Sequence, residues 1–266
     1  MTLPNFALAR PDTLEEALAL LGDDKVPYCG GTELLLAMKV GLQRPETLVD
    51  VKRVPELRGV RSSHGELVIG GASTHDELSR DALVREVLPL LAEVEAHVGN
   101  ARVRVQGSIG GNLCFAEPKS DVATTLIALD ASVTLQSSSG RRTLLVRDFV
   151  VGPYFADKEP GELLVDVRIP LVATRRGAYV KFQVTERPTV GVAVVQDTET
   201  GACRVVVGAV GEIPIWRDWA SVADINVEEL SSAVDPVEDL TGSERYKRHL
   251  TAVFIRRALR DLERSS

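Results

Sequence analysis

The chain contains 266 residues, of which 44% are hydrophobic and 26% are charged, as in an ordinary globular protein. These proportions exclude a disordered chain, a collagen-like repeat and a coiled coil, and the length allows one large domain or two modest ones. The 31 Lys and Arg residues against 38 Asp and Glu residues give a net charge of −7, and no stretch is basic enough to predict nucleic acid as a partner.

The N-terminal segment MTLPNFALARPDT has neither the charged start nor the apolar centre of a signal peptide. No apolar run approaches the ~20 residues that a membrane-spanning helix needs. The three cysteines form no CxxC pair, and the four histidines lack the spacing of metal ligands. We therefore expect a cytoplasmic protein with no membrane span and no metal of its own.

The first predicted helix follows Pro11 in the segment LEEALALLG. Thr13 is its expected N-cap, Glu16 completes a capping box three residues later, and Gly22 ends the helix. A short strand at 25–29 then enters two glycines and a helix with the sequence LLLAMK, and a second strand follows at 48–51.

A hairpin is predicted over 57–71, because RGVR and LVIG flank the turn residues Ser-His-Gly. From 74 to 97 the apolar spacing is helical, and Pro89 is expected to open a second helical segment. A glycine-dense loop at 107–112 precedes a short apolar helix at 120–131, capped by Ser120.

The following part of the chain has mainly strand character. SVTLQ and TLLV form a hairpin, and ELLVDVRIP is a strand that Pro170 closes. The runs YVKFQV, VGVAVV and CRVVVGAV predict further strands, and an amphipathic helix is expected at 243–264. The proline followed by a basic stretch at 170–176 marks the best domain boundary, and the mixture of elements predicts an α+β fold.

The familiar nucleotide-binding and nucleophile motifs are absent. No two glycines stand at positions i and i+2, so GxGxxG cannot occur, and GxxxxGK[ST] and GxSxG are missing as well. No serine or histidine is distinguished as part of a catalytic set.

Two glycine segments remain as candidate binding loops, one centred on Gly30 and Gly31 and one on Gly110 and Gly111. Adjacent glycines let backbone N–H groups approach an anion closely, and each segment leads into a helix. The alternative interpretation is that both segments are simply tight turns.

The segments CGGTELLLAMK and GSIGGNLCFAEPKSDVATTLIALDA, with GELLVDVRIP and YKRHLTAVFIRRAL, resemble the FAD-binding medium subunit of molybdenum hydroxylases. This is the family of carbon monoxide dehydrogenase and xanthine dehydrogenase. The resemblance extends over essentially the whole chain. It implies a two-lobed FAD-binding domain of the vanillyl-alcohol-oxidase (PCMH-like) type at 1–172, with lobes of about 1–55 and 56–172. A smaller C-terminal domain with an antiparallel sheet and helices would occupy 173–266.

The resemblance also implies roles for individual residues. The segments 29–33 and 108–112 would wrap the pyrophosphate of FAD, Asp121 would hydrogen-bond the polyol region, and Leu164 and Val98 would sandwich the adenine. Lys181 would approach the flavin ring, which Cys114 would also lie near. The full set of expected cofactor-binding residues is Cys29, Gly30, Gly31, Thr32, Glu33, Leu34, Val98, Ser108, Ile109, Gly110, Gly111, Asn112, Cys114, Asp121, Leu164 and Lys181.

The implied function is electron transfer within a molybdenum hydroxylase complex. A large molybdopterin subunit would oxidise the substrate, and a small subunit with [2Fe-2S] clusters would pass electrons to FAD in this chain. The electrons would leave to a quinone, NAD or another acceptor, in an assembly expected to be a dimer of heterotrimers. The alternatives are a stand-alone flavin oxidase or reductase and a scaffold without FAD. Gly111→Val is expected to abolish FAD binding, through its branched Cβ and an unfavourable backbone angle.

Overall fold

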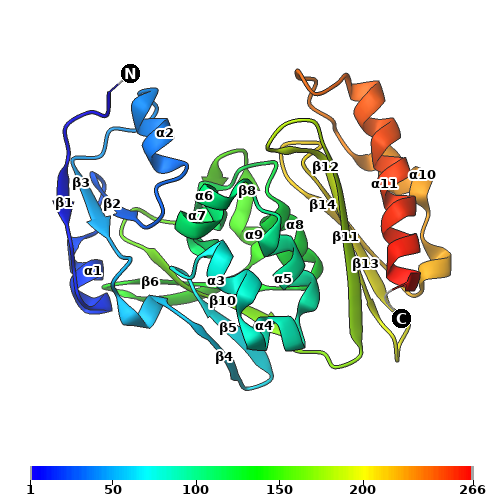
Figure 1. The fold of residues 1–266 in the computed structure, drawn as a ribbon, viewed down its shortest axis with the longest axis horizontal. Coiled ribbons are helices and arrows are strands. Elements are labelled where there is room, and N and C mark those ends of the chain that lie inside the picture. Colours follow the sequence, from blue (N-terminus) through cyan, green and yellow to red (C-terminus); the bar gives the residue numbers. More distant parts are fainter. Residues whose placement is uncertain (1, 265–266) are drawn as a thin grey trace.

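The structure is a computed structural model that describes residues 2–264. Its elements form three groups along the long axis of the molecule (Figure 1). The N-terminal group is blue, the central group runs from light blue to green, and the C-terminal group runs from yellow-green to red. Among residues 2–264, no helix combines the length and the apolar character that crossing a bilayer requires.

The N-terminal group is a parallel sheet with strand order β1-β3-β2 and two helices. The first helix is capped as predicted, because the Thr13 hydroxyl accepts a hydrogen bond from the N–H of Glu16. The Glu16 carboxylate, however, accepts from the N–H of Asp12 and not from that of Thr13, so the predicted capping box is only half present. The elements are β1 (Ala7–Ala9), α1 (Leu14–Leu20), β2 (Lys25–Tyr28), α2 (Leu34–Lys39), β3 (Thr47–Asp50) and the 3-10 turn η1 (Pro55–Leu57).

The central group contains an antiparallel sheet of order β4-β5-β10-β6-β7. The predicted hairpins are confirmed, since β4 pairs with β5 and β6 pairs with β7. The last of these strands in the sequence, β10, lies in the middle of the sheet, between β5 and β6. The strands are β4 (Val60–Ser63), β5 (Glu66–Gly70), β6 (Ser132–Ser137), β7 (Gly140–Leu145) and β10 (Leu163–Pro170), with a small pair β8 (Val150–Gly152) and β9 (Phe155–Ala156).

The helices of this group differ from the prediction at two places. Pro89 opens a helical segment as predicted, but the part before it is broken once more, because Asp81 accepts a hydrogen bond from the N–H of Val84 and so caps an additional helix. The glycine-dense segment expected as a loop is mostly the first turns of a helix, which begins at Ile109 after its N-cap Ser108. The helices are α3 (His75–Arg80), α4 (Ala82–Val87), α5 (Pro89–Ala96), α6 (Ala101–Gln106), α7 (Ile109–Phe115), α8 (Asp121–Ala128) and α9 (Val146–Phe149).

The C-terminal group is an antiparallel sheet of consecutive strands that lies between helices on both faces (Figure 1). Helix α8 packs on β12 and β13 from the central group, and α11 packs on β11 and β12 from the other side. The elements are β11 (Arg175–Gln183), β12 (Pro188–Asp197), β13 (Cys203–Gly208), β14 (Ile215–Trp219), the 3-10 turn η2 (Val222–Asp224), α10 (Val227–Ala233) and α11 (Glu244–Arg264).

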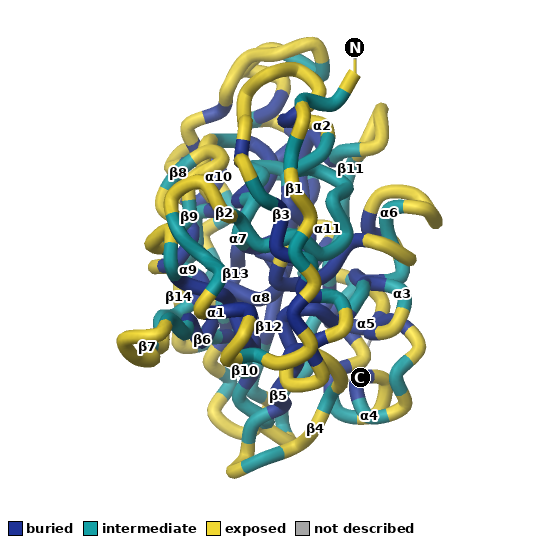
Figure 2. Tube along the Cα trace, turned by 90° about the vertical axis from the view of Figure 1, so that its left-hand side faces the viewer, coloured by how far each residue is buried: buried dark blue, intermediate teal, exposed yellow. Residues whose placement is uncertain are grey.

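Strand β12 is apolar on both faces because each face enters a different core. Ala193 and Val195 belong to the core that contains α5 and α8, whereas Val192 and Val194 belong to the core beneath α11. This alternation follows from the two-residue period of a strand. Figure 2 shows the resulting buried interior through α8 and β12, with exposed hairpin ends such as β7 around it.

Candidate functional site

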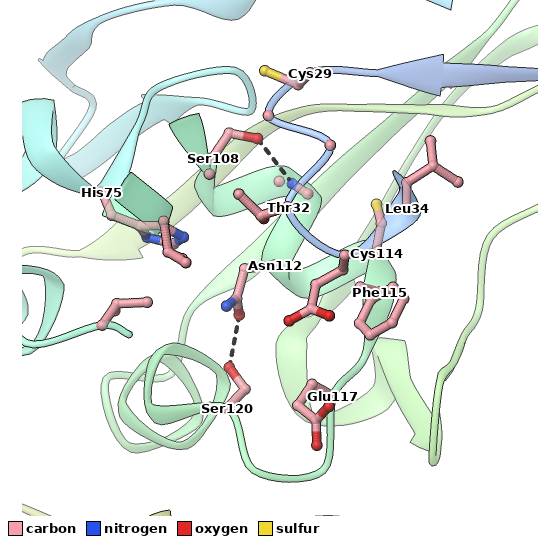
Figure 3. A pocket seen from close by; sticks show the side chains of 18 of the residues that line it. Cys29, Thr32, Leu34, His75, Ser108, Asn112, Cys114, Phe115, Glu117 and Ser120 are labelled. Atoms are coloured by element: carbon pink, nitrogen blue, oxygen red, sulfur yellow. Dashed lines mark hydrogen bonds between the residues drawn. The ribbon is translucent and has the colours of Figure 1, made fainter. Parts of the chain in front are cut away.

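A cavity of about 420 Å³ lies where the three groups of elements meet. This volume is within the range of small-molecule and cofactor sites. Its walls are the segment after β2, the α5–α6 connection, the starts of α7 and α8, part of β10 and the turn between β11 and β12. In Figure 3, the segment that carries Cys29, Thr32 and Leu34 faces Ser108, Asn112 and Cys114 of the α7 region.

The segment from Gly30 to Leu34 supplies hydrogen-bond donors that the rest of the protein does not use. Among the hydrogen bonds of the described residues, none has a backbone N–H of this segment as its donor. Gly31 has a φ of +67°, a conformation that side chains disfavour. A run of free N–H groups around such a residue is a recurrent anion-binding arrangement.

The start of α7 is held by its own hydrogen bonds. The N–H of Ile109 donates to Ser73 O at 3.0 Å, and the N–H of Gly110 donates to Gly71 O at 3.0 Å. The N–H of Gly111 donates to the Ser108 hydroxyl at 3.2 Å. These N–H groups are therefore occupied, and the free backbone donors lie on the opposite wall.

The glycines of the two segments are constrained in different ways. A Cβ on Gly30 would lie 2.1 Å from Gln106 O, and one on Gly110 would lie 2.6 Å from Gly71 O. A Cβ on Gly111 would meet only the Ser108 hydroxyl, at 3.1 Å, and would otherwise point into open space. The φ of Gly111 is not positive, so the expected unfavourable backbone angle at this position is wrong.

Most of the predicted residues line this cavity. Ile109, the first residue of α7, does not, since its side chain is fully buried in the core. Lys181 is also absent from the lining, but its ammonium group contacts a lining residue, Asp121. The predicted residues that line the cavity are Cys29, Gly30, Gly31, Thr32, Glu33, Leu34, Val98, Ser108, Gly110, Gly111, Asn112, Cys114, Asp121 and Leu164.

Asp121 is the centre of a buried polar cluster at the start of α8. The Lys181 ammonium lies 2.6 Å from its Oδ2 and also donates to His97 O at 2.9 Å. The Tyr179 hydroxyl donates to its Oδ1 at 2.5 Å. Burial, reinforced by the charge of Asp121, raises the pKa of Tyr179 well above its ordinary value. The tyrosine therefore stays neutral and acts as a donor.

Asn112 is held in place by the cap of the next helix. The Ser120 hydroxyl donates to Asn112 Oδ1 at 2.7 Å and accepts from the N–H of Ala123 at 3.0 Å (Figure 3). The amide group of Asn112 therefore faces the cavity with its carbonyl already bonded.

The two cavity cysteines are poor nucleophiles. Burial raises the pKa of Cys29, despite a hydrogen bond from Ser108 and nearby positive charges. Burial raises the pKa of Cys114 to about 11. Both are thiols at neutral pH, whereas redox-active cysteines are usually thiolates.

Several charged residues of the cavity were not predicted from the sequence. The Arg187 guanidinium contacts the Glu33 carboxylate at 3.0 and 3.1 Å and also the carboxylate of Glu117. Although burial opposes it, Glu117 and Glu33 raise the pKa of Arg187. These contacts join residues 70 and 154 positions apart, so no local sequence signal could have revealed them.

His75 is a further lining residue that the sequence did not single out. Its Nδ1 lies 2.5 Å from Glu95 Oε2, and both side chains are buried. The other carboxylate oxygen, Glu95 Oε1, has no hydrogen-bond partner. Within residues 2–264, no group of three or more His, Cys, Asp or Glu side chains could hold a metal ion.

Comparison with known proteins assigns this architecture. Residues 4–172 match the family described as "FAD binding domain in molybdopterin dehydrogenase". The chain is 32% identical to the carbon monoxide dehydrogenase medium chain of Hydrogenophaga pseudoflava, over 97% of both chains. It is 30% identical to the glyceraldehyde dehydrogenase medium chain of Sulfolobus acidocaldarius, over 97% of this chain and 99% of the relative.

A solved structure gives the same result for the fold. It is carbon monoxide dehydrogenase from Hydrogenophaga pseudoflava lacking the Mo-pyranopterin moiety of the molybdenum cofactor. The TM-score is 0.91 at 30% identity, and the match covers 100% of this chain and 99% of that one. This likeness confirms the predicted α+β architecture.

Proposed function

The chain belongs to the family of FAD-binding domains of molybdopterin dehydrogenases, and from this premise we propose that it is the electron-transfer subunit of a molybdenum hydroxylase complex. It is an FAD-binding oxidoreductase subunit, as its relatives are. In the proposed complex it accepts electrons from the [2Fe-2S] clusters of a small subunit, and a large molybdopterin subunit oxidises the substrate. The external acceptor is a quinone, NAD or a similar molecule, and the assembly is a dimer of heterotrimers.

The observation that carries the proposal is the pairing of the family match with the free N–H groups of residues 30–34 at the cavity wall. An FAD pyrophosphate needs donors of this kind. The open space beside Gly111, on the facing wall, leaves room for it. When bound, FAD supplies the redox chemistry, and the protein binds and orients it.

We assign the remaining roles by position in the cavity. Val98 and Leu164 form apolar walls for the adenine, and Asp121 accepts hydrogen bonds from the polyol region of FAD. Lys181 acts through Asp121, whose carboxylate it holds in place. Neither role requires a proton transfer by this chain.

The proposed domain boundary lies at 172–173. The family match ends at 172, β10 ends at Pro170, and β11 begins at Arg175. By this division the FAD-binding part has lobes of about 1–55 and 56–172, and residues 173–266 form the C-terminal part.

The test is a visible absorption spectrum of the chain purified from its own host, with mass spectrometry of the proteins that copurify. We expect flavin bands, iron–sulfur absorbance and two additional polypeptides, one small and one large. Flavin bands from this chain alone would indicate a stand-alone flavin oxidase or reductase. A colourless protein that takes up no added FAD would refute the proposal.

A further inference from the structure

The turn between β11 and β12 forms part of the cavity wall. It consists of residues 184–187, because Gln183 pairs with Pro188 across the two strands. Glu186, Arg187 and Pro188 line the cavity, whereas no other described residue of the C-terminal group does. The turn is thus a wall contributed by the C-terminal group to a site built mainly by the other two groups.

One side of the turn is fastened by Arg187. Its guanidinium bridges Glu33, within the free N–H segment, and Glu117, just after α7. Glu33 and Glu117 belong to the two facing walls of the cavity. A single side chain therefore ties the turn to both walls.

Glu186, the neighbouring residue of the turn, is held by a different part of the cavity wall. Asn100 donates through its Nδ2 to Glu186 Oε1 at 3.2 Å. The Oδ1 of the same Asn100 caps α6 by accepting from the N–H groups of Arg102 and Val103. This second attachment point lies beside Val98 and Gly99, at the α5–α6 side of the cavity.

The attachments of the turn are polar, and little apolar surface supports them. Val184 at its start is 68% exposed, and the side chain of Arg187 is 42% exposed. Ion pairs with this exposure are weakened by salt and can open without disrupting a core. The strands on either side are paired with each other in the C-terminal sheet and cannot move as easily.

We propose that residues 184–187 form a strap over the cavity, and that release of Arg187 from Glu33 and Glu117 sets the rate at which FAD enters and leaves. This inference rests on the proposed function, because the occupant of the cavity is FAD. FAD must pass the strap both when it binds and when it is released. The strap therefore affects the rates of binding and release more than the Kd.

The test uses the full chain loaded with isotopically labelled FAD and chased with excess unlabelled FAD. In the Arg187→Gln variant we expect release to be roughly ten-fold faster, as for the loss of two partly exposed ion pairs. Association should accelerate as well, so the Kd changes less than the release rate. The matched control is Arg256→Gln, which removes a surface ion pair with Glu228 far from the cavity, and it should leave exchange unchanged.

Salt provides a second measurement that needs no substitution. Raising the ionic strength from about 0.05 M to about 0.5 M shortens the Debye length from about 14 Å to about 4 Å. This should speed release from the wild-type chain and have little effect on Arg187→Gln. If Arg187→Gln does not fold, two other release rates test the proposal. One is the release rate of the wild-type chain at different salt concentrations, and the other is that of Arg187→Lys, which keeps the charge but cannot bridge both carboxylates.

The outcomes separate the strap from the function on which it rests. A wild-type chain that takes up no FAD would refute both. Release at the wild-type rate from Arg187→Gln would refute the strap alone. Faster release with unchanged association would also refute it, because Arg187 would then be an ordinary ligand contact.

Discussion

The glycines that line the cavity serve different physical purposes. Gly30 and Gly110 are required where two backbones touch, because a Cβ at either position would overlap a carbonyl oxygen. Gly31 is required by its positive φ. Gly111 differs from these three, because a Cβ there would meet only the Ser108 hydroxyl, at 3.1 Å, and its backbone is one that any residue could adopt. A substitution at Gly111 therefore tests ligand binding, whereas a substitution at any of the other three glycines mainly tests the stability of the fold.

Gly111→Val should fold normally and lose FAD. The valine side chain would enter the space assigned to the pyrophosphate, and overpacking of this kind costs about 1–3 kcal/mol even where neighbours can shift. Together with the loss of phosphate contacts, this overpacking should weaken FAD binding until it is no longer detected. The measurement is FAD content after gel filtration, together with the melting temperature of the chain without FAD.

Two matched variants make this result interpretable. Gly140→Val lies at the exposed start of β7, where a Cβ meets nothing within 4 Å, and should retain FAD. Gly30→Ala should lower the melting temperature of the FAD-free chain, because its Cβ would sit 2.1 Å from Gln106 O. Stoichiometric FAD in Gly111→Val would show that the pyrophosphate lies elsewhere.

Residues of the site could be predicted where they stand in a continuous motif. The segments around Gly30 and Gly110, with Asp121 just after the second, carry the family pattern, and all three line the cavity. Arg187 and His75 could not be predicted, because they reach the cavity through long-range packing and no motif marks them. The sequence also could not show that free backbone N–H groups occur in the segment around Gly30 and not in the segment around Gly110.

At the scale of elements, one carboxylate, that of Asp239, holds the loop between α10 and α11 in place. Asp239 lies 2.7 Å from the Lys119 ammonium and 2.8 Å from that of Lys247, which is 1% exposed. Lys119 lines the cavity, and Lys247 belongs to α11. Asp239 therefore links the last helix to the wall of the site.

Asp239→Asn should lower the melting temperature at neutral pH by about 2–4 °C, as for a loss on the order of 1 kcal/mol after solvent screening. Although burial alone would raise it, the bonds from Lys119, Lys247 and Thr241 hold the pKa of Asp239 well below its ordinary value. A depressed carboxyl pKa contributes stability above the unfolded pKa of about 4, and this is lost as the pH falls through the folded value.

The difference between the wild type and Asp239→Asn should therefore shrink progressively as the pH falls below about 4. Melting curves of both proteins from pH 7 downwards measure it. A difference that stayed constant across this range would show that the carboxylate charge has no part in holding the loop.

Elements with a strong sequence pattern were predicted well, and the errors have local causes. The strands β4 to β7 and β10 to β13 were predicted from apolar runs and turn residues, and the structure confirms them. The short strands β1, β8, β9 and β14 were not predicted. Helix α7 was missed because its glycines lower helix propensity, while the Ser108 cap and the bonds to Gly71 and Ser73 that stabilise it come from packing. The break at Asp81 was missed because apolar spacing continues through it.

At the scale of the whole molecule, the C-terminal sheet is an integral part of the central core. Ala193, Val195 and Val206 are buried against the α5 and α8 side, and Tyr179 and Lys181 of β11 hold Asp121 at the start of α8. A Cβ on Gly208 would lie 2.0 Å from the Thr124 hydroxyl, so the two layers are in close contact. The proposed boundary at 172–173 would therefore separate two sequence regions that share one interior.

A chain shortened to residues 1–172 should therefore not behave as an independent domain, although the family match covers almost exactly that part of it. Removing the sheet would expose the apolar face of α8 and leave Asp121 without its two partners, and a large exposed apolar patch promotes aggregation. It would also remove Glu186 to Pro188 from the cavity.

We expect most of the shortened protein to elute as aggregate in gel filtration, to bind a hydrophobic dye and to retain no FAD. The full chain should elute as a defined species with FAD bound. A shortened chain that stays monodisperse, melts cooperatively and holds FAD would show instead that the C-terminal sheet is an appendage to a self-sufficient binding domain.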